Sequence, residues 1–495
     1  MKRVLPLLFA APLLAACASY RPMRFIDRPP VTEVHDDAPS PLPEKGIFIK
    51  ELAQVDNIRH SLVEGLDPRR TPDALDVNSF DDVPRSSWFL GAMNPSDPLG
   101  GYGGDGPPQP PFELVDEPAT HPDAYRIRDV RGLDYEMLPD IEGRPGMRTA
   151  SAAITSRLLH ALGYRTPEVH VVLDHERRRV AATRWPLGVD LGPTPMGRQR
   201  EDDPNDHLPH IDRRSLRSLR MAAAWLQLLH IHPEMLRDAY LGAPGRGHVE
   251  HMLLGFEGGL GVQQWQDEIK FAADPDRETP NFFYRVFSLG LSPKPPALVP
   301  ETPWPSVGLF YDKLQVDRFK LSPPFEPSAR MRPGDAYWMA KRLAGLPLTT
   351  LSDALQAGKL DPPAINWLFQ ILCLRRAAVV AWGYDRTTPL EIVTVRPRAT
   401  GSATLVLADL AIEAHFVSPQ RRRYEVLLFD REGHYLTPTR RLRPKGSIVE
   451  IVVPRPSADY VVVQVRALVD DHPLPRALEI HLAVGETLRV LGLRH

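Results

Sequence analysis

The chain has 495 residues, a length that favours two folded domains over a single core. Its 60 lysine and arginine residues nearly balance its 62 aspartate and glutamate residues, so it lacks the basic surplus typical of nucleic-acid-binding proteins, and we expect no nucleic-acid partner. The 53 prolines, about twice the ordinary share, predict many loops and extended connections.

The N-terminus has the pattern of a secretion signal, with a positively charged start and an apolar run too short to span a bilayer. Its end, Leu14–Cys17, resembles the lipobox of bacterial lipoproteins, in which the chain is cut before a cysteine that is then acylated, for example with palmitate. Ala18 and Ser19 differ from the aspartate of an inner-membrane retention signal, so the resemblance implies the outer membrane, with the body facing the periplasm. An ordinary cleaved signal with an incidental cysteine is the alternative. The other cysteine is Cys373, which then has no partner for an intramolecular disulfide.

A polar stretch separates the signal from the compact region. Residues 17–78 mix proline with charged residues, which predicts a tether with one short docked helix at Glu51–Leu62. Further on, Gly101–Gly106 satisfies the dinucleotide pattern G-x-G-x-x-G. Prolines follow it where a helix would have to receive the pyrophosphate, so a loop is favoured.

The region from about residue 110 to 186 predicts a β-rich unit with one helix. Short alternating runs indicate strands, and apolar residues three and four apart, followed by Gly163, indicate the helix. The expected elements are strands at Phe112–Val115, Tyr125–Val130 and Tyr135–Leu138, a helix at Thr149–Leu162, and strands at Val169–Leu173 and Arg179–Trp185.

The next part of the chain is mostly helical in pattern. The expected helices are Arg213–His230, Gly334–Leu343, Leu351–Ala357 and Pro363–Gly383. Between them, Met252–Leu254 predicts a buried strand that leads into the glycine-rich turn Gly255–Gly261. Glycines allow close approaches that a Cβ would forbid, and active sites are often built this way. At the tip of this turn, Glu257 is the one residue that can bind a metal or move a proton.

From Pro389 onward the pattern changes to short alternating runs separated by turn residues. The expected strands are Ala403–Leu407, Arg423–Phe429, Ser447–Val453, Tyr460–Arg466 and Ala477–Val484. About a hundred residues of this kind predict a small antiparallel β-sandwich.

Several stretches resemble a family of largely uncharacterised bacterial envelope proteins. The similar pieces are Phe80–Phe89, Leu158–Tyr164, Asp202–Asp206 with Pro209-His210 and Arg213-Arg214, Trp225-Leu226, and Asp335–Lys341. They follow the family's order between about residues 79 and 384, and the tail ending in Gly492-Leu-Arg is similar too. Intact members look kinase-like. The resemblance therefore implies an α+β fold with a two-lobed core, a β-rich N-lobe and an α-helical C-lobe, followed by the β-sandwich.

At the positions where such a core would hold its catalytic groups, this chain carries other residues. Kinase chemistry needs a lysine that clamps phosphates, a glutamate that positions it, an aspartate that orients the hydroxyl, and two kinds of magnesium ligand. The resemblance places these roles, in that order, at Leu138, Ala152, Leu229, Met235 and Gly255. None of these side chains can pair with phosphate or coordinate magnesium. We therefore expect an inactive core with no cofactor and no binding of ATP or magnesium.

Three groups of polar residues remain as candidate binding residues. The loop cluster could bind a metal, although a solvated loop is the simpler interpretation, and Asp212 is expected to cap the following helix. The arginines on that helix could bind an anion or an acidic partner, although a solvated face with salt bridges is more typical. The histidines near the assigned catalytic positions could bind zinc or copper, although ordinary surface or groove histidines are more typical. The candidates are Asp202, Asp203, Asp206, His207 and His210 in the loop, Arg213, Arg214, Arg217 and Arg220 on the helix, and His230, His232, His248, His251 and Glu257 near those catalytic positions.

The sequence thus predicts four segments: a signal peptide (1–16), a lipidated N-terminus and tether (17–78), a degenerate kinase-like domain (79–388) and a β-sandwich domain (389–495). The predicted function is that of an outer-membrane lipoprotein that acts as a non-catalytic, pseudokinase-like binding or scaffold protein, with another envelope protein as its partner. Two alternatives stay open. One is an active phosphotransferase-like or metal-dependent enzyme with displaced catalytic residues, and the other is a structural lipoprotein whose β-sandwich binds partners.

Overall fold

The protein is a mixed α+β chain with several antiparallel sheets. The structure is a computed structural model that describes residue 25 and residues 36–44, 73–91, 97, 99–100, 102, 104–116, 119, 121–185, 188–195, 199–231, 235–262, 302–319, 321, 325–398, 401–455 and 459–495. The predicted signal peptide (1–16), Cys17, the short helix at Glu51–Leu62 and His232 lie outside these residues.

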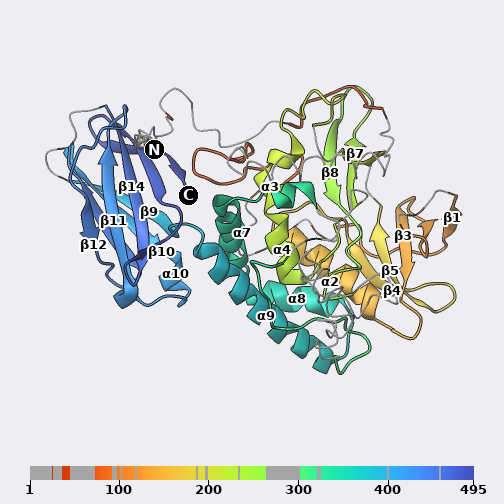
Figure 1. Ribbon diagram of the computed structural model, residues 1–495. Coiled ribbons are helices and arrows are strands. Elements are labelled where there is room, and N and C mark those ends of the chain that lie inside the picture. The colour runs from red at the N-terminus through yellow and green to blue at the C-terminus, as the bar shows by residue number, and fades with distance from the viewer. Residues whose placement is uncertain are drawn as a thin grey trace, which may run out of the picture.

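The first sheet has five antiparallel strands in the order β1-β2-β3-β5-β4. Its strands are β1 (Glu113–Val115), β2 (Tyr125–Arg128), β3 (Asp134–Pro139), β4 (Val169–Leu173) and β5 (Arg179–Arg184). Helix α2 (Met147–Ala161) packs against β3, β4 and β5. The predicted succession of three strands, one helix and two strands is confirmed (Figure 1).

Helix α2 begins at a carboxylate cap and is buried almost throughout. The side chain of Asp140 accepts hydrogen bonds from the backbone N–H groups of Arg148 and Thr149, at 3.1 and 2.9 Å, which satisfies two amides that have no partner within the helix. Every residue of α2 except Arg157 is buried. The helix therefore forms the centre of the region between the first sheet and the helical part.

Helices dominate the middle of the chain. They are α3 (Arg214–Arg217), α4 (Leu219–Leu226), α6 (Glu326–Ala329), α7 (Pro333–Gly345), α8 (Leu348–Ala357) and α9 (Pro362–Tyr384), with a short 3-10 helix, η2, at His210–Asp212. Helices α2, α4, α7, α8 and α9 contribute to one hydrophobic core. Among the described residues, α9 is long and apolar enough to cross a membrane by length and composition, yet it packs against α4, α7 and α8 as a core helix does.

The prediction of one continuous helix at Arg213–His230 is wrong. The segment is divided at Ser218 into α3 and α4, and α4 ends at Leu226. Gln227 adopts the left-handed conformation with φ of 50°, and the N–H of Leu228 bonds back to the carbonyl of Ala223 at 2.9 Å. Such a left-handed residue terminates a helix, so Leu229 and His230 lie beyond it.

A small antiparallel sheet in the order β6-β7-β8 stands beside the helices. Its strands are β6 (Val189–Pro193), β7 (Leu236–Leu241) and β8 (His248–Leu253). The buried strand expected at Met252–Leu254 is the end of β8. The glycine-rich turn follows directly.

The C-terminal part forms two packed antiparallel sheets. A three-stranded sheet has the order β13-β10-β9, and a six-stranded sheet has the order β12-β11-β14-β16-β17 with β15 paired to β14. Side chains of both sheets share one hydrophobic core, which makes this part a β-sandwich as predicted. The strands are β9 (Leu390–Pro397), β10 (Ala403–Asp409), β11 (Arg422–Phe429), β12 (Arg440–Leu442), β13 (Ile448–Val453), β14 (Tyr460–Val469), β15 (His472–Pro473), β16 (Leu478–Val484) and β17 (Leu488–Arg494), with short helices α10 (Leu410–Glu413) and η7 (Pro419–Arg421).

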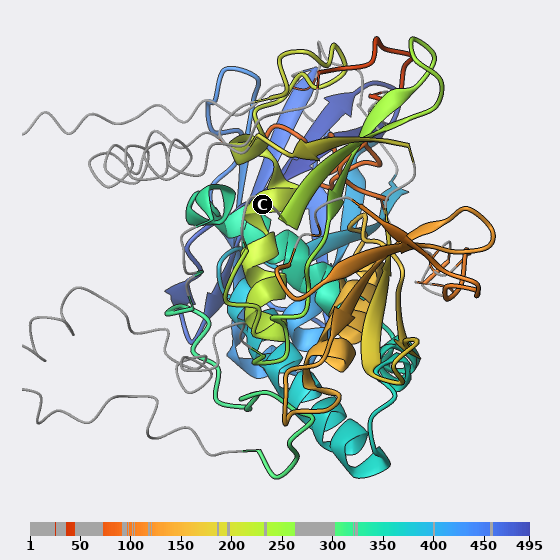
Figure 2. The same cartoon turned by 90° about the vertical axis from the view of Figure 1, so that its right-hand side faces the viewer.

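The sandwich and the first sheet lie at opposite ends of the molecule, with the helices between them (Figure 1). In the view turned by 90°, the first sheet is in front and the sandwich lies behind it (Figure 2). One face of the first sheet is directed towards the helices, and this face is remote from the sandwich.

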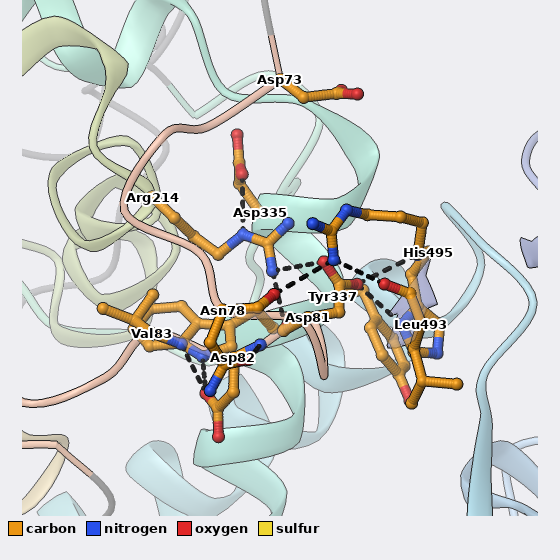
Figure 3. A network of polar contacts seen from close by, with 12 residues as sticks. Asp73, Asn78, Asp81, Asp82, Val83, Arg214, Asp335, Tyr337, Leu493 and His495 are labelled. Carbon is orange, nitrogen blue, oxygen red and sulfur yellow. Dashed lines mark hydrogen bonds and ion pairs between the residues drawn. The ribbon is translucent and has the colours of Figure 1, made fainter. Parts of the chain in front are cut away.

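The end of β17 and His495 join the sandwich to the helical part (Figure 3). The backbone N–H and Nδ1 of His495 contact Asp81 Oδ2 at 3.0 and 2.8 Å, and the His495 ring lies over Tyr337 with centroids 4.3 Å apart. The N–H of Leu493 donates to the carbonyl of Ser79 at 2.7 Å. The stretch around Asp81, which carries part of the family resemblance, is therefore a structural junction between sandwich and core.

Candidate functional site

A groove lies between the first sheet, α2 and the turn that follows β8. Its lining comes from β3, α2, β4, β5 and the turn. It includes three of the five positions at which the resemblance places catalytic groups: Leu138, Ala152 and Gly255. The full lining is His121, Glu136, Leu138, Ala152, Pro167, Val169, Thr183, Trp185, Leu254, Gly255, Phe256 and Glu257. The structure thus brings together residues that the resemblance assigned to one site from separate parts of the chain.

Apolar packing occupies the place of the expected phosphate clamp. Leu138 on β3 and Ala152 on α2 are 6% and 4% exposed, and they share a hydrophobic cluster with Val169, Val171 and Ala181. A lysine and a glutamate at these two positions would form an ion pair. The side chains present exclude water and hold no charge, so they cannot contact phosphate oxygens.

The two positions at which magnesium ligands are expected carry Met235 and Gly255, whose side chains cannot coordinate magnesium. Gly255 has a φ of 69°, and a Cβ added there would lie 3.3 Å from Cγ of Met235. Gly255 and Met235, the two positions at which the resemblance places magnesium ligands, are therefore neighbours. Leu229, by contrast, packs against the helical core and is not part of the groove lining.

The groove lining includes two carboxylates, Glu136 and Glu257, each 7% exposed. Nε of Arg126 lies 4.0 Å from Glu136, and its guanidinium stacks over the Trp185 ring at 3.5 Å from the centroid. The groove has about 20 Å³ of space open to the centre of a water molecule, within about 450 Å³ of space that is free of protein atoms and includes open solvent. Because about 10–15 Å³ of such space holds one water molecule, the enclosed part has no room for a nucleotide.

The glycines of the turn after β8 serve close packing. A Cβ at Gly259 would lie 2.3 Å from Oγ1 of Thr155 on α2, and a Cβ at Gly261 would lie 2.4 Å from the carbonyl oxygen of Leu309. The hydroxyl of Ser151, also on α2, donates to the carbonyl of Gly259 at 2.6 Å. The turn therefore fits closely against α2 and against the backbone at Leu309, and this close packing accounts for glycine at positions 259 and 261.

We expect Gly259→Ala to lower the free energy of unfolding by about 1–3 kcal/mol, because the new methyl group overpacks the contact with Thr155. Gly258→Ala is the matched control. Its Cβ would meet atoms at 3.5 Å and beyond, and we expect a change within about 0.5 kcal/mol. Urea unfolding curves of both variants measure the difference, and equal stabilities would refute the packing role.

The loop cluster is divided between surface and interior. Asp202 and His207 are exposed, whereas Asp203, Asp206 and His210 are buried. Asp206 Oδ2 contacts His210 Nε2 at 2.6 Å, and Asp206 Oδ1 accepts from Arg213 at 2.8 Å. The interpretation of this cluster as a solvated loop is therefore wrong for its buried members, and a metal at Asp206 would have to displace both partners.

Sequence reasoning missed the residues that complete this network. Trp88 stacks on His251 with centroids 4.1 Å apart and also contacts His210 at 4.6 Å. His251 Nδ1 contacts Asp238 Oδ1 at 2.7 Å, and Arg200 donates to Asp238 Oδ2 at 3.0 Å. The expectation of a surface or groove histidine is thus wrong for His251, which is 2% exposed. The sequence held one signal for this network, namely that Trp88 lies within Phe80–Phe89, a stretch that carries the resemblance.

A segment of the predicted tether lies over the same network. The N–H of Glu44 donates to Asp202 at 3.0 Å, and Asn205 donates to the carbonyl of Ala38 at 2.8 Å. Both oxygens of Asp36 accept the N–H of Ser87 at 2.9 Å. Part of the predicted tether, residues 36–44, is therefore docked on the core.

Arg213, Arg214 and Arg217 are buried, so the prediction of a solvated helix face is wrong for these three. Arg220, on α4, is half-buried. Arg214 contacts Asp81 and Asp335 at 3.0 and 3.1 Å (Figure 3). Arg217 is fully buried and pairs with Asp212. With Arg213 bound to Asp206, these guanidinium groups stabilise the interior and are not presented to an anion or an acidic partner.

Two further expectations are corrected. Asp212 does not cap the helix, since its carboxylate pairs with Arg217 and Arg330. Asp76 performs that role from a distant segment, accepting from the backbone N–H of Arg214 and from the hydroxyl of Ser215. His230 and His248 are half-buried.

Among the described residues, possible metal ligands converge at Asp430, Glu432 and His434, whose ligand atoms lie within 4.8 Å of one another. This group is a turn of the sandwich in which Asp430 accepts from the backbone N–H groups of Glu432 and His434, at 3.0 and 2.8 Å. The turn accounts for the arrangement without an ion, and it does not include the predicted loop cluster.

We expect the contribution of Asp206 to stability to depend on pH. Burial alone would raise the pKa of Asp206, but the hydrogen bond from His210 and the charge of Arg213 hold it well below its usual range. Since the folded-state pKa lies well below the unfolded value of about 3.9, the stabilisation is complete above about pH 5. It begins to be lost near pH 4 and is lost fully only as the pH falls through the folded-state pKa. Asp206→Asn should lose about 1.5–3 kcal/mol at pH 7 and progressively less below pH 4. Denaturation curves of the wild-type protein and Asp206→Asn at pH 7 and at a pH below 4 test this prediction. A difference in stability that does not change with pH would contradict it.

Comparison with known proteins adds little to this geometry. No protein-family model matches the chain, and no curated protein matches it. Among solved structures, the crystal structure of CtkA, a proinflammatory kinase of Helicobacter pylori, is weakly similar, with a TM-score of 0.35 and 9% sequence identity. The similarity covers 57% of this chain and 98% of the kinase. At this level it says nothing about the site.

Proposed function

We propose that this chain is a bacterial envelope lipoprotein whose kinase-like core has lost its catalytic groups and acts by binding another envelope protein. The observation that carries the proposal is the groove lining. Leu138 and Ala152 belong to a buried apolar cluster, where an active core would need an ion pair. Gly255 and Met235 replace the magnesium ligands.

The small enclosed volume of the groove supports the same conclusion. A protein that keeps the kinase-like fold but binds a partner without catalysis can fill its nucleotide site with apolar side chains. Burial of these side chains stabilises the core. The interaction with a partner then belongs to the outer surface. On this proposal ATP, magnesium and nucleic acid are not ligands.

The membrane anchor rests on Leu14–Cys17 and the signal that precedes it. Metabolic labelling with radioactive palmitate in a Gram-negative host tests it directly. We expect label in the wild-type protein, none in Cys17→Ser, and wild-type label in Cys373→Ser as the matched control. Absence of label from the wild-type protein would refute the anchor.

The competing proposal of a metal-dependent enzyme makes a different prediction for thermal unfolding. A cation that binds the folded state raises the melting temperature by mass action. We expect no rise with magnesium or zinc at millimolar concentration, because Asp206 and Asp238 are already paired with arginines. A rise that disappears in Glu257→Gln or in Asp202→Asn would favour the enzyme.

Removal of residues 389–495 is not a clean test of whether the sandwich alone binds partners. That deletion would also remove His495 from Asp81 and Tyr337. Surface substitutions on the sandwich, made in the full chain, are the suitable alternative.

A further inference from the structure

Phe25 is inserted into the sandwich although it belongs to the predicted tether. It is 4% exposed, its N–H donates to the hydroxyl of Tyr460 at 3.1 Å, and its ring meets the His481 ring edge-on with centroids 4.7 Å apart. The guanidinium of Arg494 stacks over it at 4.6 Å. Strands β14, β16 and β17 therefore each contribute a side chain to the site that holds Phe25.

The backbone of β17 is shaped to receive this ring. A Cβ added at Gly492 would lie 3.0 Å from two ring carbons of Phe25 and 2.6 Å from the carbonyl oxygen of Ser79. Tyr460 and His481 are fully buried, and the Tyr460 hydroxyl also contacts His481 Nδ1 at 2.8 Å. A buried aromatic ring with polar and cationic partners is a firm attachment point.

The position of Phe25 limits how far the sandwich can be from the lipid anchor. Eight residue steps separate Cys17 from Phe25 in the sequence, and a fully extended chain covers at most about 3.6 Å per residue, or about 29 Å in total. If Phe25 were not held, the next described contact would be Asp36, and the same arithmetic would allow about 68 Å. A folded chain of this size has a radius of gyration of about 23 Å. A tether of at most about 29 Å keeps the folded body close to the membrane surface, whereas a tether of about 68 Å would not.

We infer that the site formed by Tyr460, His481, Gly492 and Arg494 fixes the orientation of the protein, with this face of the β-sandwich turned towards the lipid surface and the first sheet pointing away. The inference rests on the proposed lipidation of Cys17. It makes the lipid surface a partner of the sandwich and leaves the first sheet and its groove accessible from the periplasm.

Energy transfer to a membrane dye tests the orientation in the full, acylated protein. A donor dye is placed by Asp459→Cys, next to Tyr460, or by Glu113→Cys on β1, each in a Cys373→Ser background. The protein is reconstituted into phosphatidylethanolamine and phosphatidylglycerol vesicles that carry a headgroup-linked acceptor. We expect stronger transfer from position 459 than from position 113, and loss of that difference in Phe25→Ala. Leu42→Ala, an exposed position in the same N-terminal region, should leave the difference unchanged.

Two controls separate the possible failures. If the acylated protein does not float with vesicles, the anchor and the proposed membrane location fail, and the orientation fails with them. If it floats but both donors transfer equally, only the orientation is refuted. The melting temperature of the unacylated protein reports the contact alone, and it should fall in Phe25→Ala but not in Leu42→Ala.

Discussion

Arg214→Ala is expected to lower the free energy of unfolding by about 3–5 kcal/mol, because it leaves buried carboxylates without their counter-charge. Arg214 contacts Asp81 at 3.0 Å and Asp335 at 3.1 Å, and both aspartates are at most 3% exposed. Burial by itself would raise the pKa of Asp81, but Arg214 and His495 hold it far below its usual range. Loss of the arginine reverses that balance and loosens the junction with the sandwich. Urea denaturation followed by tryptophan fluorescence measures the change.

Arg441→Ala is the matched control for this prediction. Its side chain is 66% exposed and contacts Glu425 at 2.8 Å, and exposed ion pairs contribute about 0–1 kcal/mol. If Arg214→Ala were no more destabilising than Arg441→Ala, the junction in Figure 3 would not be a main support of the fold.

Leu138→Lys is expected to destabilise the protein by about 3–5 kcal/mol, since it places an unpaired charge in a buried apolar cluster. Adding Ala152→Glu should recover part of the loss by supplying a partner, but we expect no gain of nucleotide binding because Gly255 and Met235 still offer no magnesium ligand. Leu114→Lys is the control, at a position of the same sheet that is 78% exposed. Its stability should change by less than about 0.5 kcal/mol. If Leu138→Lys alone were stable and bound ATP, the groove would be competent after all.

Local sequence pattern was enough to predict most of the secondary structure. The strands of the first sheet alternate side chains between its faces, and α7, α8 and α9 have apolar residues at helical spacing, so each signal is contained in a few neighbouring residues. The end of α4 at Leu226 was missed, because Gln227 carries no sequence signal for the left-handed conformation that ends this helix.

The resemblance gave the order of the assigned catalytic positions along the chain. Leu138, Ala152 and Gly255 line one groove, whereas Leu229 packs against the helical core. The buried polar networks could not be predicted. Asp81 contacts residues 133 and 414 positions away in the sequence, and no local pattern shows such a pairing. A cluster of charged residues therefore looked solvated when read along the chain and proved to be interior.

Isothermal titration calorimetry of the mature protein with ATP and magnesium tests directly whether the core has lost nucleotide binding. The residues at the assigned clamp and magnesium positions cannot pair with phosphate or coordinate magnesium, so we expect no heat of binding at millimolar nucleotide. A saturable isotherm with a dissociation constant below about 1 mM, equivalent to about −4 kcal/mol, would contradict it.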